Sequence, residues 1–210
     1  MSEDRSAAET RSDQTVTTDR PLAAERAAEL RRRVLEVVRE QGYVRRDEAF
    51  QLSSGDWSHD YVDGKRALAA GAQLRLAAEA VVAQAEERGI AFDAVGGLTM
   101  GADPLGRAVA VVSGAGWFSV RKEAKAHGRQ KLIEGAALGP ATAVVVVEDV
   151  VTTGRSMLLA LDAVEATGAR AVLAVTLLDR GDAAGRALAE RGIAYAPLAT
   201  YKDLGIEPIK

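Results

Sequence analysis

The apolar residues of the chain fall into short continuous runs and into repeats at helical spacing. Residues 144–147 are four consecutive valines, without alternation. Such a run is typical of a strand that is covered on both faces, because β-branched side chains pack well on a pleat and a parallel sheet buries both sides. Apolar residues from Met157 to Val164 then recur at helical spacing. The pattern predicts a central strand followed by a helix.

The same two patterns alternate through most of the chain. Helices are predicted over residues 21–41, 71–88, 105–112, 157–165 and 183–191, and strands over 93–97, 117–120, 144–147 and 171–178. Strands that alternate with helices predict an α/β fold with a parallel sheet and right-handed crossovers. Before this region, residues 50–52 and 59–63 have extended character around the turn residues 53–56, which predicts a hairpin.

The first 19 residues differ from the rest. They are rich in Ser, Thr, Asp and Glu and nearly lack large apolar side chains, which predicts a disordered tail. Helical periodicity begins at Pro21, with Asp19 as the expected N-cap and Gly42 as the stop. We therefore expect one domain over residues 20–210.

Composition narrows the class of protein. The chain of 210 residues has 48% hydrophobic residues, a net charge of -3 and no cysteine. These values suit one globular domain, exclude disulfides and thiolate metal sites, and argue against nucleic acid as a partner. No apolar run approaches the ~20 residues needed to span a bilayer, and the first residues do not form a secretory signal. We expect a soluble, cytoplasmic protein without a membrane partner.

The polar residues directly after the valine run carry the first candidate chemistry. Glu148 and Asp149 are followed by two threonines, Gly154 and Ser156, just before the predicted helix. The first turn of a helix leaves N–H groups unpaired and favours anions, and a glycine lets the backbone approach a ligand. Carboxylates can accept hydrogen bonds from a sugar diol or hold a divalent cation. The stretch predicts a site for a phosphorylated ribose; the alternative is an ordinary turn, in which Thr or Ser caps the helix.

Three further polar stretches follow predicted strands. They are residues 96–103, 121–131 and 179–180. Over residues 121–134 five basic residues stand against two acidic ones, a local excess of positive charge in an acidic chain. The carboxyl ends of parallel strands share one edge of a sheet. All four stretches are therefore expected on one rim.

These residues also carry a family resemblance. Residues 144–156 resemble the fingerprint of type I phosphoribosyltransferases, and three other segments resemble the orotate phosphoribosyltransferases among them. Residues 52–55 with 60–63 are similar to the N-terminal hairpin of these enzymes, 120–128 to their mobile catalytic loop, and 178–180 to their base-recognition turn. The similarity is collinear from about Leu30 to Leu204. It implies a type I phosphoribosyltransferase-like parallel sheet flanked by helices, with a small N-terminal hood.

The resemblance implies transfer of ribosyl phosphate from 5-phosphoribosyl-1-pyrophosphate (PRPP) to orotate, a step of pyrimidine biosynthesis, with Mg²⁺ as cofactor near Glu148 and Asp149. The residues that match catalytic positions are Arg121, Lys125 and His127. Those that match PRPP-binding positions are Arg121, Lys122, Lys125, His127, Glu148, Asp149, Val150, Val151, Thr152, Thr153, Gly154, Arg155 and Ser156. Those that match orotate-binding positions are Tyr61, Thr152 and Arg180. A homodimer is also implied, in which Lys122 reaches the neighbouring subunit's site.

Two departures from the family pattern leave alternatives open. Ser53 and Met100 stand where many members have lysines that contact the substrates. Arg180 suits a carboxylate through its planar fork, but it could instead cap a helix or pair with Asp182. The alternative functions are transfer to another nucleobase, or a non-enzymatic regulator that senses PRPP.

Overall fold

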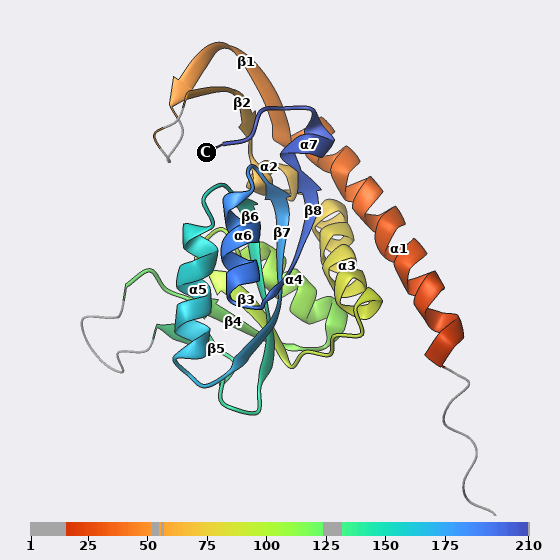
Figure 1. Cartoon of the computed structure of the whole chain (residues 1–210). Coiled ribbons are helices and arrows are strands. Elements are labelled where there is room, and N and C mark those ends of the chain that lie inside the picture. The colour runs from red at the N-terminus through yellow and green to blue at the C-terminus, as the bar shows by residue number, and fades with distance from the viewer. Residues whose placement is uncertain (1–15, 52–54, 56, 124–131, 210) are drawn as a thin grey trace, which may run out of the picture.

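A six-stranded sheet forms the centre of the molecule (Figure 1). The coordinates are a computed structural model that describes residues 16–51, 55, 57–123 and 132–209. The strand order is β5-β4-β3-β6-β7-β8, and β5 alone runs antiparallel to its neighbour. The bounds are β3 Ala94–Leu98, β4 Gly116–Val120, β5 Ile133–Gly135, β6 Ala143–Val151, β7 Arg170–Asp179 and β8 Ala194–Thr200. The predicted α/β fold is confirmed; β5 and β8 were not predicted.

The valine run lies in the middle of this sheet and is buried on both faces. Val144 and Val146 pack in one core cluster with Met157 of α5 (Arg155–Glu165). Val145 and Val147 pack in the other cluster, with α3 (Gly71–Glu87) and α4 (Asp103–Ser113). The α6 helix (Ala183–Glu190) joins α5 on its face. Alternate side chains therefore serve both layers, as the unbroken apolar run predicted.

The first helix begins earlier than predicted. The α1 helix covers Val16–Val37 with Pro21 inside it, and a π-helical turn Val38–Gly42 follows. Pro21 therefore lies within α1 and not at its first turn, where the sequence had predicted it. Residues 1–15 of the predicted tail lie outside the described part of the chain. No helix of the described residues is long and apolar enough to cross a membrane.

The predicted hairpin is present beyond the carboxyl edge of the sheet (Figure 1). Its strands are β1 (Tyr43–Gln51), longer than predicted, and β2 (Trp57–Val62), and a short helix α2 (Gly64–Ala67) follows. Asp63 caps α2 by accepting a hydrogen bond from the Arg66 N–H at 3.0 Å. Ser53 lies outside the described residues.

The end of the chain returns to the same edge. After β8, the capping box of Thr200 and Asp203 starts the short helix α7 (Tyr201–Leu204), and Gly205 ends it in the left-handed conformation. Residues 205–209 then run from α7 toward the region between the hairpin and α6 (Figure 1). Hairpin, sheet edge and chain end therefore come together in one region.

Candidate functional site

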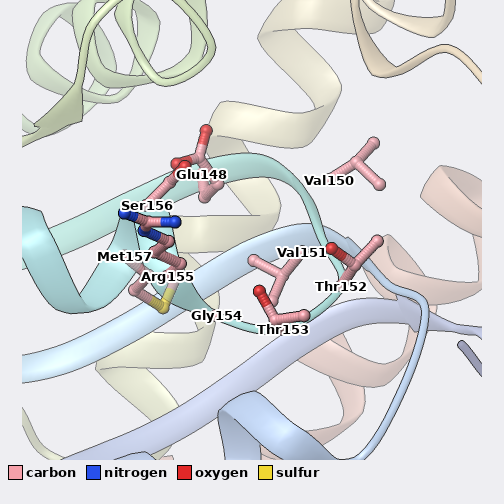
Figure 2. Close-up of a pocket in the computed structure, with 9 residues that line it drawn as sticks. All are labelled: Glu148, Val150, Val151, Thr152, Thr153, Gly154, Arg155, Ser156 and Met157. Carbon is pink, nitrogen blue, oxygen red and sulfur yellow. The ribbon is translucent and has the colours of Figure 1, made fainter. Parts of the chain in front are cut away.

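A cavity of about 460 Å³ lies at the carboxyl end of β6. Figure 2 shows how the chain turns back on itself between Val150 and Gly154, so that strand end and helix start face one space. The lining residues are Glu148, Val150, Val151, Thr152, Thr153, Gly154, Arg155, Ser156 and Met157. Eight of the nine are among the residues predicted to bind PRPP, and their role in binding stays a prediction.

The start of α5 is open rather than capped. Gly154 is the N-cap, with φ at 81° in the left-handed region, and no side chain accepts a hydrogen bond there. The cap by Thr or Ser that the alternative of an ordinary turn expects is therefore not formed. A side chain at position 154 would also crowd the start of α6, because its Cβ would lie 3.0 Å from that of Ala184. The arrangement leaves the first-turn N–H groups of α5 available to an anion.

The two carboxylates at the end of β6 differ in environment. Glu148 is buried, with 4% exposure, and its Oε1 accepts a hydrogen bond from the Asp149 N–H at 3.3 Å. Burial raises the pKa of Glu148 to about 8, and the neighbouring charge of Asp149 adds to the rise. The Asp149 Oδ1 accepts a hydrogen bond from the Val150 N–H at 2.8 Å. The pair therefore holds hard oxygen donors beside the cavity.

Lys65, which the sequence did not single out, and Gly101, from the predicted polar stretch 96–103, approach this pair. The Lys65 ammonium of α2 lies 3.0 Å from Asp149 Oδ2, and its pKa is raised mainly by that hydrogen bond. Gly101, in the loop after β3, leaves no room for a side chain: a Cβ would lie 2.5 Å from Glu148 Oε1 and 2.7 Å from Asp149 Oδ1. No sequence pattern indicated that Lys65 lies near the site, whereas the predicted polar stretch 96–103 was a weak indication for Gly101.

The loop after β3 is tied to the next strand through Asp103. Its carboxylate accepts hydrogen bonds from the Thr99 hydroxyl at 2.8 Å and the Ser119 hydroxyl at 2.9 Å. Met100, which replaces a frequent lysine of the family, is 73% exposed. The loop thus presents an apolar side chain, and no cation, at that position.

Only part of the predicted catalytic loop is described. Arg121 follows β4 and forms an ion pair with Glu134, with Nη1 and Oε1 3.1 Å apart, and Lys122 is exposed. The other predicted residues, Lys125 and His127, lie outside the described residues. Their catalytic roles stay predictions.

Arg180 lies at the end of β7, next to the cavity. Its N–H donates to the backbone oxygen of Val151, a lining residue, at 2.8 Å. The side chain is 2% exposed, and its Nη1 donates to the backbone oxygen of Asp60 in β2 at 3.0 Å. Within the described residues, Nε and Nη2 have no hydrogen-bond partner. Asp182 accepts instead from the Tyr201 hydroxyl at 3.2 Å, so the alternative pairing of Arg180 is not the one formed.

A buried guanidinium with free donors is unusual, because unpaired buried polar groups cost free energy. Burial lowers the pKa of Arg180, although an arginine keeps its proton near neutral pH. The free donors suit an anionic group with two oxygens in one plane, such as a carboxylate. This is the chemistry that the sequence predicted for Arg180.

Tyr61, the third residue predicted to bind orotate, packs within the hairpin. Its ring contacts Phe50 edge to face, with centroids 5.6 Å apart, and the Arg46 guanidinium lies 5.2 Å from its centroid. It is 36% exposed and is not among the residues that line the cavity. A role for Tyr61 in orotate binding stays a prediction.

The predicted magnesium site depends on which oxygen donors the described residues bring together. The described residues contain no group of three or more His, Cys, Asp or Glu side chains that could hold a metal ion by themselves. Mg²⁺ that arrives with a phosphate substrate needs only one or two protein carboxylates, and Glu148 and Asp149 provide them. The residues therefore fit a metal that binds together with the substrate.

Known proteins similar to this chain show its family. Residues 68–191 match the model of the phosphoribosyl transferase domain. An orotate phosphoribosyltransferase of Corynebacterium glutamicum is 38% identical over 184 residues, covering 85% of this chain and 96% of the relative, and one of Rhodopirellula baltica is 37% identical over 168 residues, covering 76% and 86%.

A solved structure is also similar. The orotate phosphoribosyltransferase of Mycobacterium tuberculosis in complex with PRPP has a TM-score of 0.69 and 34% sequence identity, covering 84% of this chain and 99% of that one. Similarity in sequence and similarity in fold thus agree. The chain belongs to the phosphoribosyltransferase family, among the orotate phosphoribosyltransferases.

Proposed function

We propose that the protein transfers the ribosyl phosphate of PRPP to orotate and releases pyrophosphate and orotidine 5′-phosphate, a step of pyrimidine biosynthesis. The observation that supports orotate is the buried guanidinium of Arg180, two of whose nitrogens have no partner among the described residues. Arg180 itself does not line the cavity, but its backbone N–H is bonded to the lining residue Val151. Among nucleobases that could enter such a site, orotate is distinguished by its carboxylate. The curated relatives reported above carry the same activity in their names.

In this proposal the cavity loop holds the ribose phosphate. The open N-terminus of α5, with the hydroxyls of Thr152, Thr153 and Ser156, binds the 5′-phosphate. Glu148 and Asp149 accept hydrogen bonds from the ribose diol. Thr152 adds a contact to the base, because its backbone lies against the turn that carries Arg180.

The reaction then needs positive charge at the leaving group. A ring nitrogen of orotate forms a bond to C1 of the ribose as the C1–oxygen bond to pyrophosphate breaks, and the electron pair leaves with pyrophosphate. Arg121 and Lys122, with Lys125 and His127, stabilise that developing charge. Glu148 and Asp149 would hold Mg²⁺ together with the substrate, and the bound ion would supply further positive charge to the phosphates.

The assembly belongs to the same proposal. We infer a single domain over residues 20–210 with the hairpin as its hood, and a homodimer in which Lys122 completes the neighbouring subunit's site. The exposure of Lys122 is compatible with that role. A cytoplasmic location remains a prediction from the composition.

The proposal is tested with a panel of bases. Purified protein with Mg²⁺ and PRPP is expected to consume orotate, measured by the loss of its ultraviolet absorbance. Turnover of hypoxanthine, xanthine or uracil without turnover of orotate would support the alternative of another base. PRPP binding without turnover of any base would support the sensor.

A further inference from the structure

The last residues of the described chain lie directly against the turn that carries Arg180. The Ile209 N–H donates to the Arg180 carbonyl oxygen at 2.7 Å. Ile209 is only 7% exposed. A Cβ added at Gly181 would lie 2.5 Å from the Ile209 carbonyl oxygen, so the two backbones are in contact. No role was predicted for this segment from the sequence.

The turn is also fixed from its other sides. The backbone N–H of Arg180 donates a hydrogen bond to the Val151 carbonyl oxygen. The Asp179 carboxylate accepts hydrogen bonds from the Gly181 N–H at 3.1 Å and from the Tyr195 hydroxyl at 2.9 Å. The remaining backbone group of the turn is the Arg180 carbonyl oxygen, and its hydrogen bond comes from the Ile209 N–H. The chain end therefore supplies the bond that completes the restraint of this backbone.

Such restraint matters because of how Arg180 is used. A guanidinium recognises a carboxylate through two parallel hydrogen bonds, and this geometry tolerates only small displacements of the backbone. In the part of the chain that the structure describes, the side chain donates one hydrogen bond, from Nη1 to the Asp60 carbonyl oxygen, and Nε and Nη2 have no partner. The direction of the free donors thus depends on the backbone at residue 180.

We propose that the C-terminal segment, residues 205–209, is a positioning element for orotate recognition: its Ile209 N–H holds the Arg180 turn in the conformation that presents the free guanidinium nitrogens to the substrate carboxylate. The inference rests on the proposed role of Arg180 and adds a residue that touches no substrate. Pro208 limits the freedom of the segment just before the contact.

Two variants remove the contact in different ways. Ile209→Pro lacks the N–H donor, and Gly181→Ala places a methyl group 2.5 Å from the Ile209 carbonyl oxygen, too close for the two backbones to keep their contact. We expect each to raise the KM for orotate about fivefold or more, the effect of losing one hydrogen bond that orients a charged group. The kcat and the Kd for PRPP, from isothermal titration calorimetry, are expected to stay within about twofold. The methyl group of Gly181→Ala meets the loop before α5 only at ordinary contact distance, 3.5 Å from the Thr152 carbonyl oxygen.

A matched control and a double-mutant cycle separate positioning from general damage. Gly185→Ala adds the same methyl group in α6, where the nearest atom is 3.6 Å away, in Tyr195, and should leave the orotate KM unchanged. In an Arg180→Ala background, Ile209→Pro should have no further effect on the orotate KM, because its effect acts through Arg180.

The outcomes distinguish the inference from the proposed function. If Arg180→Ala leaves the orotate KM unchanged, the proposed base site is wrong. If Arg180→Ala raises it but Ile209→Pro and Gly181→Ala do not, the base site stands and the positioning role fails. An equal rise in KM for orotate and Kd for PRPP, with a lower melting temperature, would also overturn the positioning role.

Discussion

The ends of β6 and β7 lie side by side, yet they are built in different ways. The β6 end forms a cavity from one continuous stretch, Glu148 to Met157, whose helix start has no side-chain cap. The β7 end is bound by groups from β2, β6, β8 and the chain end, all converging on residues 179–181. The comparison teaches that a phosphate needs mainly backbone N–H groups from one loop, whereas a planar carboxylate needs a side chain fixed from several directions.

The largest effect is expected from removing the Arg180 side chain at the end of β7. Arg180→Ala should lower kcat/KM for orotate by about 100-fold to 1,000-fold, because the substrate carboxylate loses its buried charged partner. The melting temperature should hardly change, since the variant also removes two unpaired buried donors. Steady-state kinetics and calorimetry measure both. Arg186→Ala, an exposed arginine of α6, is the control; an equal loss there would contradict the assignment.

The second effect concerns Glu148, because burial of its side chain disfavours the ionised form of the carboxyl group. Because its pKa is about 8 in the folded protein, its contribution to stability is full below pH ~4.5 and is lost as the pH rises toward ~8. The unfolding free energy of ligand-free protein in EDTA should therefore fall by roughly 3 kcal/mol more between pH 5 and 8 in the wild type than in Glu148→Gln. Urea denaturation at several pH values measures it. The exposed Glu190→Gln should keep the wild-type slope; the same slope in all three proteins would refute the prediction.

The third prediction tests whether the site at the end of β6 also depends on the loop after β3. Gly101→Ala places a methyl group within 2.7 Å of oxygens of both Glu148 and Asp149, so the loop or the carboxylates must move. We expect the Kd for PRPP to rise about tenfold, in line with the cost of overpacking a filled site. Gly139→Ala has no atom within 4 Å of the added carbon and should bind PRPP normally. Unchanged binding by Gly101→Ala would show that the carboxylates do not need this loop in place.

The smallest expected effect concerns the ion pair of Lys65 and Asp149. Lys65 is largely exposed, and exposed pairs contribute little, so Lys65→Met should weaken PRPP binding by only about twofold to fivefold. Lys65→Arg should restore most of the loss, and Arg66→Met, the next residue of α2, should have no effect. A loss near that of Gly101→Ala would mean that Lys65 contacts the substrate directly.

The two ends also differ in how well the sequence predicted them. The valine run, the polar loop and the glycine before α5 are adjacent in the chain, so periodicity and residue chemistry located the cavity. Arg180 was located by its place after a strand, but its partners at Asp60 and Ile209 are 120 and 29 residues away in the sequence and left no local pattern. Lys65 was not predicted for the same reason, because its partner Asp149 is 84 residues away in the sequence.

The sequence by itself determined the order of strands and helices, the buried central strand and the loop that forms the cavity, because these depend on neighbouring residues and on the covalent order of the chain. It did not determine where α1 begins, that β5 and β8 extend the sheet, or which residues lie against Glu148, Asp149 and Arg180. Those contacts join segments far apart in the chain, and only the packing of hairpin, sheet and chain end brings them within hydrogen-bond distance.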